Sequence, residues 1–279
     1  MIELGELRVH VLRAGSFALD GGALFGVVPR ALWERAHPPD ERNRVSLACN
    51  VALVETGGKR LLIDTGIGDK WSGKQREIYR IERESGLIEG LAGLGLGPDD
   101  IDVVVNTHLH FDHAGGNTRL QDGRAVPSFP RARYVVQLGE WEDATRPHER
   151  SHASYLEENF VPLAEARQLD PVQGEQEVAP GVRLLPVGGH TAYHQMVLIE
   201  GGGRTLALPT DLLATAAHLP LAWLTAYDLF PLATLAAKRK LLKDAAEKDW
   251  LLLLYHDPGA PLGRVREEKG RYVMSEVQA

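Results

Sequence analysis

The chain has 279 residues, of which 44% are hydrophobic and 25% charged, and its formal net charge is −7. A negative net charge excludes a generally basic surface for phosphate backbones, so nucleic acid is not expected as the main partner. The single cysteine, Cys49, excludes an internal disulfide, and without a signal sequence or a long apolar run we expect a cytoplasmic, single-domain protein (residues 1–279) with no membrane contact.

The first part of the chain has the apolar pattern of β-strands. The strand-like stretches are ELRVHVLRAG, SLACNVALVET and KRLLIDTG, and TGGK at residues 56–59 predicts a hairpin turn between the last two. Apolar residues at helical spacing predict a helix over residues 74–94, and the charges in its first half indicate an exposed or lid-like helix. The buried strand IDVVVNTH follows it.

A similar pattern recurs in the second half. We expect strands in ARYVVQ, VRLLPVGGH, HQMVLIEGG, RTLALPTD and WLLLLYHD, and helices in HASYLEENFVPLAEA and PLATLAAKRKLLKDAAEKD. Two batches of strands, each accompanied by helices, predict an α/β fold in which two sheets pack together with helices outside them.

Four segments end in histidine or aspartate directly after an apolar strand: VVVNTHLHFDH, LLPVGGH, LALPTD and LLLLYHD. Strand ends deliver side chains to a shared cleft, so these residues are expected to converge: His108, His110, Asp112, His113, His190, Asp211 and His256. Imidazoles and carboxylates suit Zn²⁺, Mn²⁺ or Fe²⁺. Packing has no use for four titratable groups within six positions, because desolvating them without a counter-ion is costly. The sequence therefore predicts a metal site.

These motifs resemble those of the metallo-β-lactamase superfamily over essentially the whole chain. THLHFDHAGG resembles its H-x-H-x-D-H signature, LLIDTG its first motif, and GGHTAYHQ, LPTDLL and YHD its later ligand motifs. The resemblance implies an αββα sandwich, with two mixed β-sheets and helices on the outer faces. It also implies a centre of two divalent metal ions at one edge of the sandwich.

Matching positions imply a role for each residue of this centre. The first metal would be held by His108, His110 and His190, the second by Asp112, His113 and His256, with Asp211 as the bridge. Asp64 would orient a ligand histidine by a hydrogen bond, and His194 would play a similar supporting part. Zinc is the expected ion, although the same ligands accept manganese, iron or cobalt.

Two flanking stretches resemble the branch of this superfamily that quenches quorum sensing by opening N-acyl homoserine lactones. They are LDGGALFGVVPRALW, residues 19–33, and DLLATAAHLPLAWLTAYDLFP, residues 211–231. The resemblance implies that they shape the substrate pocket, which makes Phe25 and His218 substrate-binding candidates. The best-known lactonases have a substrate-binding tyrosine three residues after the bridging aspartate. Here that position is Ala214, so His218 is also a catalytic candidate.

With two metals in place, a bridging water would lose a proton and attack the lactone carbonyl as hydroxide, while Asp112 would pass the proton to the leaving oxygen. The expected partner is a small-molecule substrate with an apolar tail. A thioesterase of the glyoxalase II type and a phosphotriesterase are alternatives that use the same centre. A non-catalytic binding protein and an oxygen-dependent iron enzyme are further alternatives. Acyl-chain preference and oligomeric state stay open, and a homodimer is among the options.

Overall fold

Alternating apolar residues build two seven-stranded sheets in the computed structural model, which describes residues 1–82 and 86–277. The first sheet contains, in spatial order, β1 (Ile2–Leu4), β2 (Leu7–Asp20), β3 (Arg44–Thr56), β4 (Lys59–Ile63), β5 (Val103–Val105), β8 (Arg133–Gln137) and β9 (Leu169–Val172). The second contains β10 (Gln176–Ala179), β11 (Val182–Pro186), β12 (Gln195–Gly201), β13 (Arg204–Leu208), β14 (Leu251–Leu253), β15 (Leu262–Glu268) and β16 (Arg271–Glu276). Both sheets are mixed, because β4, β5, β8 and β9 pair in parallel, as do β13 and β14, whereas the other neighbours are antiparallel.

The facing sides of the two sheets form the central core. Val103 and Val105 of β5 and Leu206 of β13 point into it, and all three are buried. Their neighbours Val104 and Ala207 belong to the two outer cores, under the helices. The period-2 alternation of strand side chains thus explains why such strands are apolar on both faces.

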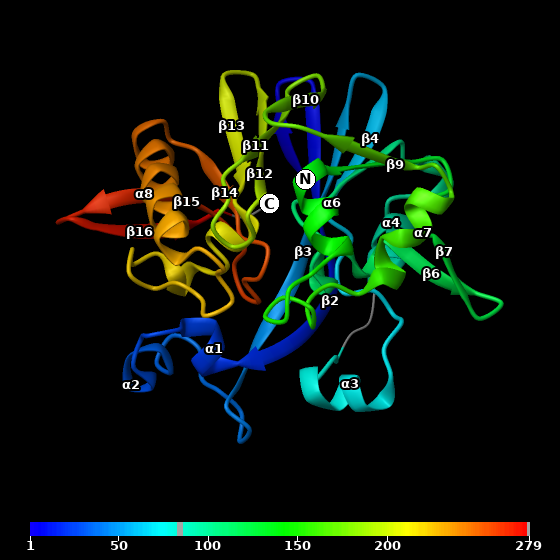
Figure 1. Ribbon diagram of the computed structural model, residues 1–279. Helices are drawn as coiled ribbons and strands as arrows, with labels where there is room; N and C mark the ends of the chain where they lie inside the picture. The colour runs from blue at the N-terminus through cyan, green and yellow to red at the C-terminus, as the bar shows by residue number, and fades with distance from the viewer. Residues whose placement is uncertain (83–85, 278–279) are drawn as a thin grey trace.

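Helices cover both outer sides and complete the expected αββα sandwich (Figure 1). On the second sheet lies α8 (Pro231–Glu247), whose buried face includes Leu241 and Leu242. The helices that contribute to the core on the outer side of the first sheet are α1 (Gly21–Phe25), α2 (Arg30–Trp33), α4 (Leu87–Gly93), α5 (Phe111–Ala114), α6 (Leu138–Thr145) and α7 (Val161–Glu165). The fold also contains α3 (Gly73–Tyr79), the hairpin of β6 (Thr118–Gln121) and β7 (Arg124–Pro127), and several short 3-10 turns.

Two predicted helices are shorter than expected. In place of one helix over residues 74–94, the structure has α3 and α4, and residues 83–85 lie outside the described part. Arg80 ends α3 in the left-handed conformation, with φ of 42°, and no side chain of α3 is buried to hold a longer helix in place. Within residues 152–166 the α-helix begins only at Val161, because Pro162 has no N–H group and fits only the first turn.

The hairpin predicted at residues 56–59 is confirmed. Thr56 pairs with Lys59, and Gly57 and Gly58 both have positive φ, as a two-residue turn between twisted strands requires.

Among the described residues, no helix is long and apolar enough to cross a bilayer.

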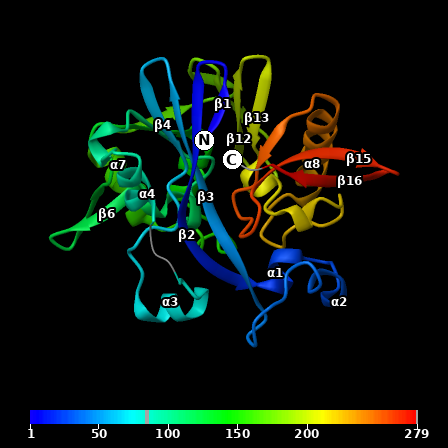
Figure 2. The same cartoon turned by 180° about the vertical axis from the view of Figure 1, so that it is seen from behind.

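The four strands that were expected to deliver the metal ligands are β5 in the first sheet and β11, β13 and β14 in the second. The candidate residues therefore come from both sheets. Figure 2 shows the long strands β2 and β3 extending past the sandwich toward α1 and α2, and α3 lies at the same end. Of these segments, β2, β3, α1 and α3 supply part of the wall of the cavity described below.

Candidate metal centre

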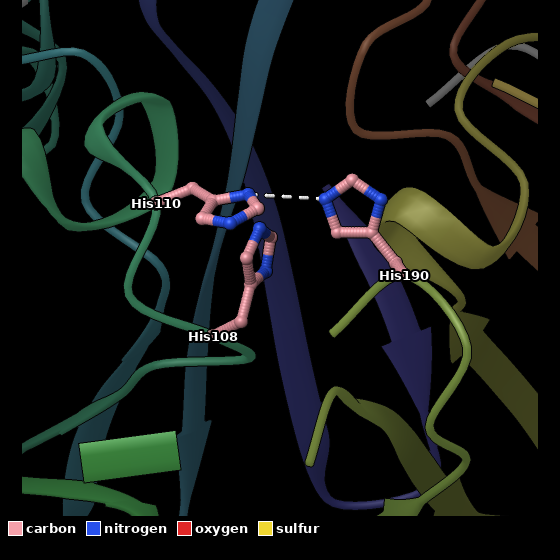
Figure 3. Close-up of side chains that lie close together, drawn as sticks. All are labelled: His108, His110 and His190. Carbon is pink, nitrogen blue, oxygen red and sulfur yellow. Dashed lines mark hydrogen bonds between the residues drawn. The ribbon is translucent and has the colours of Figure 1, made fainter. Parts of the chain in front are cut away.

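Three histidines from two loops meet at this edge of the sandwich (Figure 3). His108 and His110 lie on the loop after β5, and His190 lies on the loop after β11. Nε2 of His190 is 3.1 Å from Nδ1 of His110, and the ring centroid of His108 is 4.5 Å from that of His110. One nitrogen from each ring lies within 4.8 Å of the other two, so the group could hold a metal ion.

A second group of the same kind lies beside the first. Asp112 and His113 belong to α5, and His256 follows β14. Nε2 of His256 is 3.2 Å from Nε2 of His113 and 3.5 Å from Oδ2 of Asp112. All three are buried, and their ligand atoms also lie within 4.8 Å of one another.

Asp211 lies between the two groups. Its Oδ2 is 3.1 Å from Nε2 of His190 in the first group. Its Oδ1 is 3.2 Å from Nε2 of His113 and 3.1 Å from Nε2 of His256 in the second. With one oxygen facing each group, this carboxylate has the orientation that a bridging ligand needs.

Asp64 determines which nitrogen of two histidines carries the proton. Its Oδ2 accepts hydrogen bonds from Nδ1 of His113 and from the hydroxyl of Thr107, both at 2.8 Å. Because the Thr107 hydroxyl donates to Asp64, its oxygen accepts from Nδ1 of His108, 3.2 Å away. A proton on Nδ1 leaves Nε2 of each neutral ring with a free lone pair.

Two more histidines, His190 and His256, are held in one tautomer by a hydrogen bond from Nδ1. Nδ1 of His190 donates to Asp228 at 3.0 Å, and Nδ1 of His256 donates to the backbone oxygen of Ala48 at 2.8 Å. Carboxylate and carbonyl partners of this kind fix the orientation of metal-binding histidines. The lone pairs on Nε2 therefore point toward the centre in both groups.

This arrangement fits divalent cations. Lone pairs of His113 and His256 face each other at 3.2 Å with no proton between them in these tautomers. In the described part of the chain, the buried Nε2 of His108 has no hydrogen-bond partner, and Nδ1 of His110 faces Nε2 of His190 at 3.1 Å. Buried, unsatisfied acceptors that converge on a carboxylate are unfavourable unless a cation binds among them.

Charge is unevenly distributed across the centre. Burial, aided by the neighbouring histidine charges, holds the pKa of His108 well below its usual value. Burial opposes a charge on His113 as well, but the negative charges of Asp211, Asp112 and Asp64 raise the pKa of His113 well above its usual value. The excess of carboxylates around His113 attracts a proton in that position and would attract a metal ion for the same reason.

His194 lies behind the first group. Its ring centroid is 5.2 Å from that of His108, and its Nε2 is 2.7 Å from the hydroxyl oxygen of Thr210, the residue before Asp211. Burial lowers the pKa of His194 to about 3, so the ring is neutral. It contacts the centre and holds the segment that carries Asp211.

The centre opens into a cavity of about 380 Å³. Its walls are mainly apolar and include Leu19, Leu24, Leu47, Phe111 and Leu229. The cavity also reaches His110, Asp112, His190, Asp211 and His256, so a molecule in it would contact both groups of candidate ligands.

The structure does not bring Phe25 and His218 into this cavity. Their rings stack on each other at 4.8 Å with an angle of 6°, and both are buried. Nε2 of His218 donates to the backbone oxygen of Leu24 at 3.1 Å, and Nδ1 accepts from the hydroxyl of Thr215 at 2.8 Å. Because burial lowers the pKa of His218 to about 3, the ring is neutral and both nitrogens are engaged. This pair supports Leu24, which lines the cavity.

The first prediction follows from this position. His218→Ala is expected to lower the free energy of unfolding by about 2–4 kcal/mol, because it leaves a cavity against Phe25 and two polar groups without a partner. Urea unfolding measures the change, with the exposed His152→Ala as the control. Slower turnover at unchanged stability would instead support the catalytic role predicted from the sequence.

Tyr79, Tyr227 and Asp228 were not among the candidates. Both tyrosines line the cavity, and Asp228 bonds His190. The stretch 211–231 had been selected for its resemblance to lactonases and contains TAYD, but no local spacing distinguishes these residues from loop residues. Tyr79 lies at the end of α3, in the segment expected to be lid-like.

Comparison with known proteins agrees with this arrangement. Residues 45–256 match the family model of the metallo-β-lactamase superfamily. A curated N-acyl homoserine lactonase from a Bacillus species is 31% identical over 158 residues, which is 53% of this chain and 56% of that protein. The matched region thus spans just over half of that relative's length.

Solved structures extend the similarity to the whole chain. A probable metal-dependent hydrolase from Staphylococcus aureus is 33% identical, with a TM-score of 0.91 and complete coverage of both chains. AidC, a dizinc quorum-quenching lactonase, shares the fold with a TM-score of 0.82 at 21% identity, covering 100% of this chain and 97% of its own. The family model, the two mixed sheets and the candidate metal ligands at one edge of the sandwich agree with one another. This chain belongs to the metallo-β-lactamase superfamily.

Proposed function

We propose that this protein is a dinuclear metal-dependent hydrolase that opens a lactone ring, either an N-acyl homoserine lactone or a related lactone. The observation that carries the proposal is the set of inward-facing nitrogen lone pairs on both sides of Asp211, at the floor of an apolar cavity. The similarity to curated N-acyl homoserine lactonases supports this choice of substrate.

Two sets of residues are proposed to hold the ions. The first is His108, His110 and His190, the second is Asp112, His113 and His256, and Asp211 joins them. When bound, two divalent ions would polarise a substrate carbonyl and lower the pKa of a water molecule between them. Zinc is our first choice, and the donor set also suits manganese, iron and cobalt.

Asp112 is placed to move a proton. Its carboxylate reaches the cavity, and its backbone oxygen is held by the hydroxyl of Tyr255 at 2.9 Å. From a fixed position the carboxylate can accept the proton of the attacking water and return it to the leaving alkoxide oxygen. No protein nucleophile is required for this scheme.

Tyr79 and Tyr227 are proposed to orient the substrate. Within the described residues neither phenol has a hydrogen-bond partner, and both face the cavity. Burial raises the pKa of both phenols, and the charge on Asp112 raises it further. Both phenols therefore remain protonated donors. A carbonyl oxygen of the substrate can accept from them, while the apolar walls contact its tail.

We further propose that residues 1–279 act as one catalytic unit. The residues that line the cavity range from Leu19, near the start of the chain, to His256, near its end. Both sheets contribute to one site, so neither half of the chain contains it complete.

The second prediction tests the function directly. The metal-loaded protein is expected to release acid from a long-chain N-acyl homoserine lactone well above the background rate, and a pH-stat measures this release. Treatment with a chelator is expected to abolish it, and metal analysis is expected to find two ions per chain. Absence of release from the loaded protein, together with turnover of a thioester or a phosphotriester, would contradict lactone opening and favour one of those activities.

A further inference from the structure

Beside the three histidines of the first group lies a carboxylate that belongs to none of the ligand motifs. Glu140 is in the first turn of α6 and is fully buried. Its Oε1 accepts hydrogen bonds from the backbone N–H of Leu109 at 3.0 Å and from the hydroxyl of Tyr155 at 2.9 Å. Its Oε2 accepts from the hydroxyl of Thr191 at 2.6 Å.

Each donor belongs to a segment that carries or touches a histidine of the first group. Leu109 lies between the two histidines of the loop after β5, and Thr191 directly follows His190. The ring of Tyr155 packs against the ring of His110, with centroids 4.9 Å apart. One carboxylate thus fastens both ligand loops to the same point of α6.

A requirement for stability alone does not explain this residue. Removing a carboxylate from water is costly, and well-packed apolar groups of similar size commonly stabilise a core as well or better. Three donors offset the cost at Glu140 because hydrogen bonds to a charged acceptor are strong and directional. What such a network provides, and an apolar side chain does not, is a defined position for each loop.

The second group has a carboxylate of its own. Asp64 bonds His113 directly and reaches His108 through Thr107. Within the described residues, Glu140 makes no hydrogen bond to the second group, and its three partners all lie on the side of His110 and His190. The two buried carboxylates therefore hold different parts of the centre.

We propose that Glu140 is a positioning residue that sets the metal affinity of the site formed by His108, His110 and His190. This inference rests on the dinuclear centre of the proposed function. It assigns the affinity of one of the two metal positions to a residue that contacts neither ion. The second position is expected to be independent of Glu140.

Glu140→Gln tests the inference without an activity assay. Glutamine keeps the size of the side chain but removes its charge, so all three hydrogen bonds are weakened, and the hydroxyl of Thr191 can keep its bond only by accepting from the NH₂ group. The holoprotein is dialysed against increasing concentrations of EDTA, and the zinc that remains bound is measured. The variant is expected to lose one of its two ions at a chelator strength about 10- to 100-fold lower than the wild type requires, and to keep the other.

Three further variants test the assignment. Glu142→Gln removes an exposed carboxylate from the same helix and is expected to bind both ions like the wild type. Thr191→Val removes a single donor and is expected to weaken the same ion as Glu140→Gln, to a smaller extent. In a His190→Ala background, which already lacks the first position, Glu140→Gln is expected to leave the remaining ion unchanged.

Three outcomes would overturn the inference. Retention of both ions with wild-type affinity would show that the network does not control the site. Parallel weakening of both ions, with a lower melting temperature, would show a general structural role. A wild-type protein that binds no metal would remove the proposed function as well, whereas one that binds two ions with Glu140→Gln unaffected would remove only the role of Glu140.

Discussion

Replacing His110 by alanine is expected to abolish hydrolysis and to lower bound metal from two ions toward one. His110 is one of the three histidines of the first group, and its Nδ1 faces Nε2 of His190 at 3.1 Å. Loss of an outer partner of a metal ligand typically costs 10- to 100-fold in affinity or activity, so loss of a ligand should reduce kcat/KM by more than about 100-fold.

Metal analysis and lactone hydrolysis together measure this effect. The exposed His148→Ala is a matched control, because it removes an imidazole outside the cavity and is expected to change neither quantity. Full activity of His110→Ala with normal metal content would contradict the ligand assignment. Loss of activity with both ions retained would indicate a role in substrate binding instead.

The fold could be predicted because its signal is repeated along the chain. Apolar strands such as those ending at Val105, Leu208 and Leu253 alternate with turns and with the amphipathic helix α8, and the sandwich is the arrangement that buries both faces of such strands. The failures concern short helices. Local spacing suggested one helix through Arg80, but the left-handed residue at its end depends on contacts that spacing does not contain.

The convergence of the seven candidate ligands could be predicted for a different reason. Four of them lie within six residues of one another, the other three follow apolar strands, and strand ends share an edge of the sandwich. The structure brings all seven within reach of Asp211 or of one another, and their role as ligands remains our proposal.

Residues that act through tertiary contacts could not be found in this way. Glu140 and Asp228 lie 50 and 38 positions from His190 and belong to none of the ligand motifs. His218 is the opposite case: it lies only seven positions from Asp211, yet it does not line the cavity. A short helical turn, Ala216–His218, directs its ring to Leu24 and away from the cavity. Proximity in sequence does not determine the direction of a side chain after a turn.

Replacing Asp112 by asparagine is expected to slow lactone hydrolysis by about 10²- to 10⁴-fold, the range associated with a general acid or base. Asparagine keeps the shape of the side chain and an oxygen near His256, where Oδ2 of Asp112 lies 3.5 Å from Nε2, but it cannot take up and return a proton. Metal content is therefore expected to fall less than in His110→Ala. The measurement is kcat at saturating lactone with metal content determined on the same sample.

A change of leaving group separates the two functions of Asp112. An alkoxide is a poor leaving group that needs a proton, whereas the thiolate released from the matching thiolactone leaves without one. If Asp112 returns the proton, the defect of Asp112→Asn should be several-fold smaller for the thiolactone than for the lactone. An equal defect for both substrates would mean that Asp112 does not protonate the leaving oxygen, and that proton would then have to be carried by another group in the cavity, for which Tyr79 and Tyr227 are candidates.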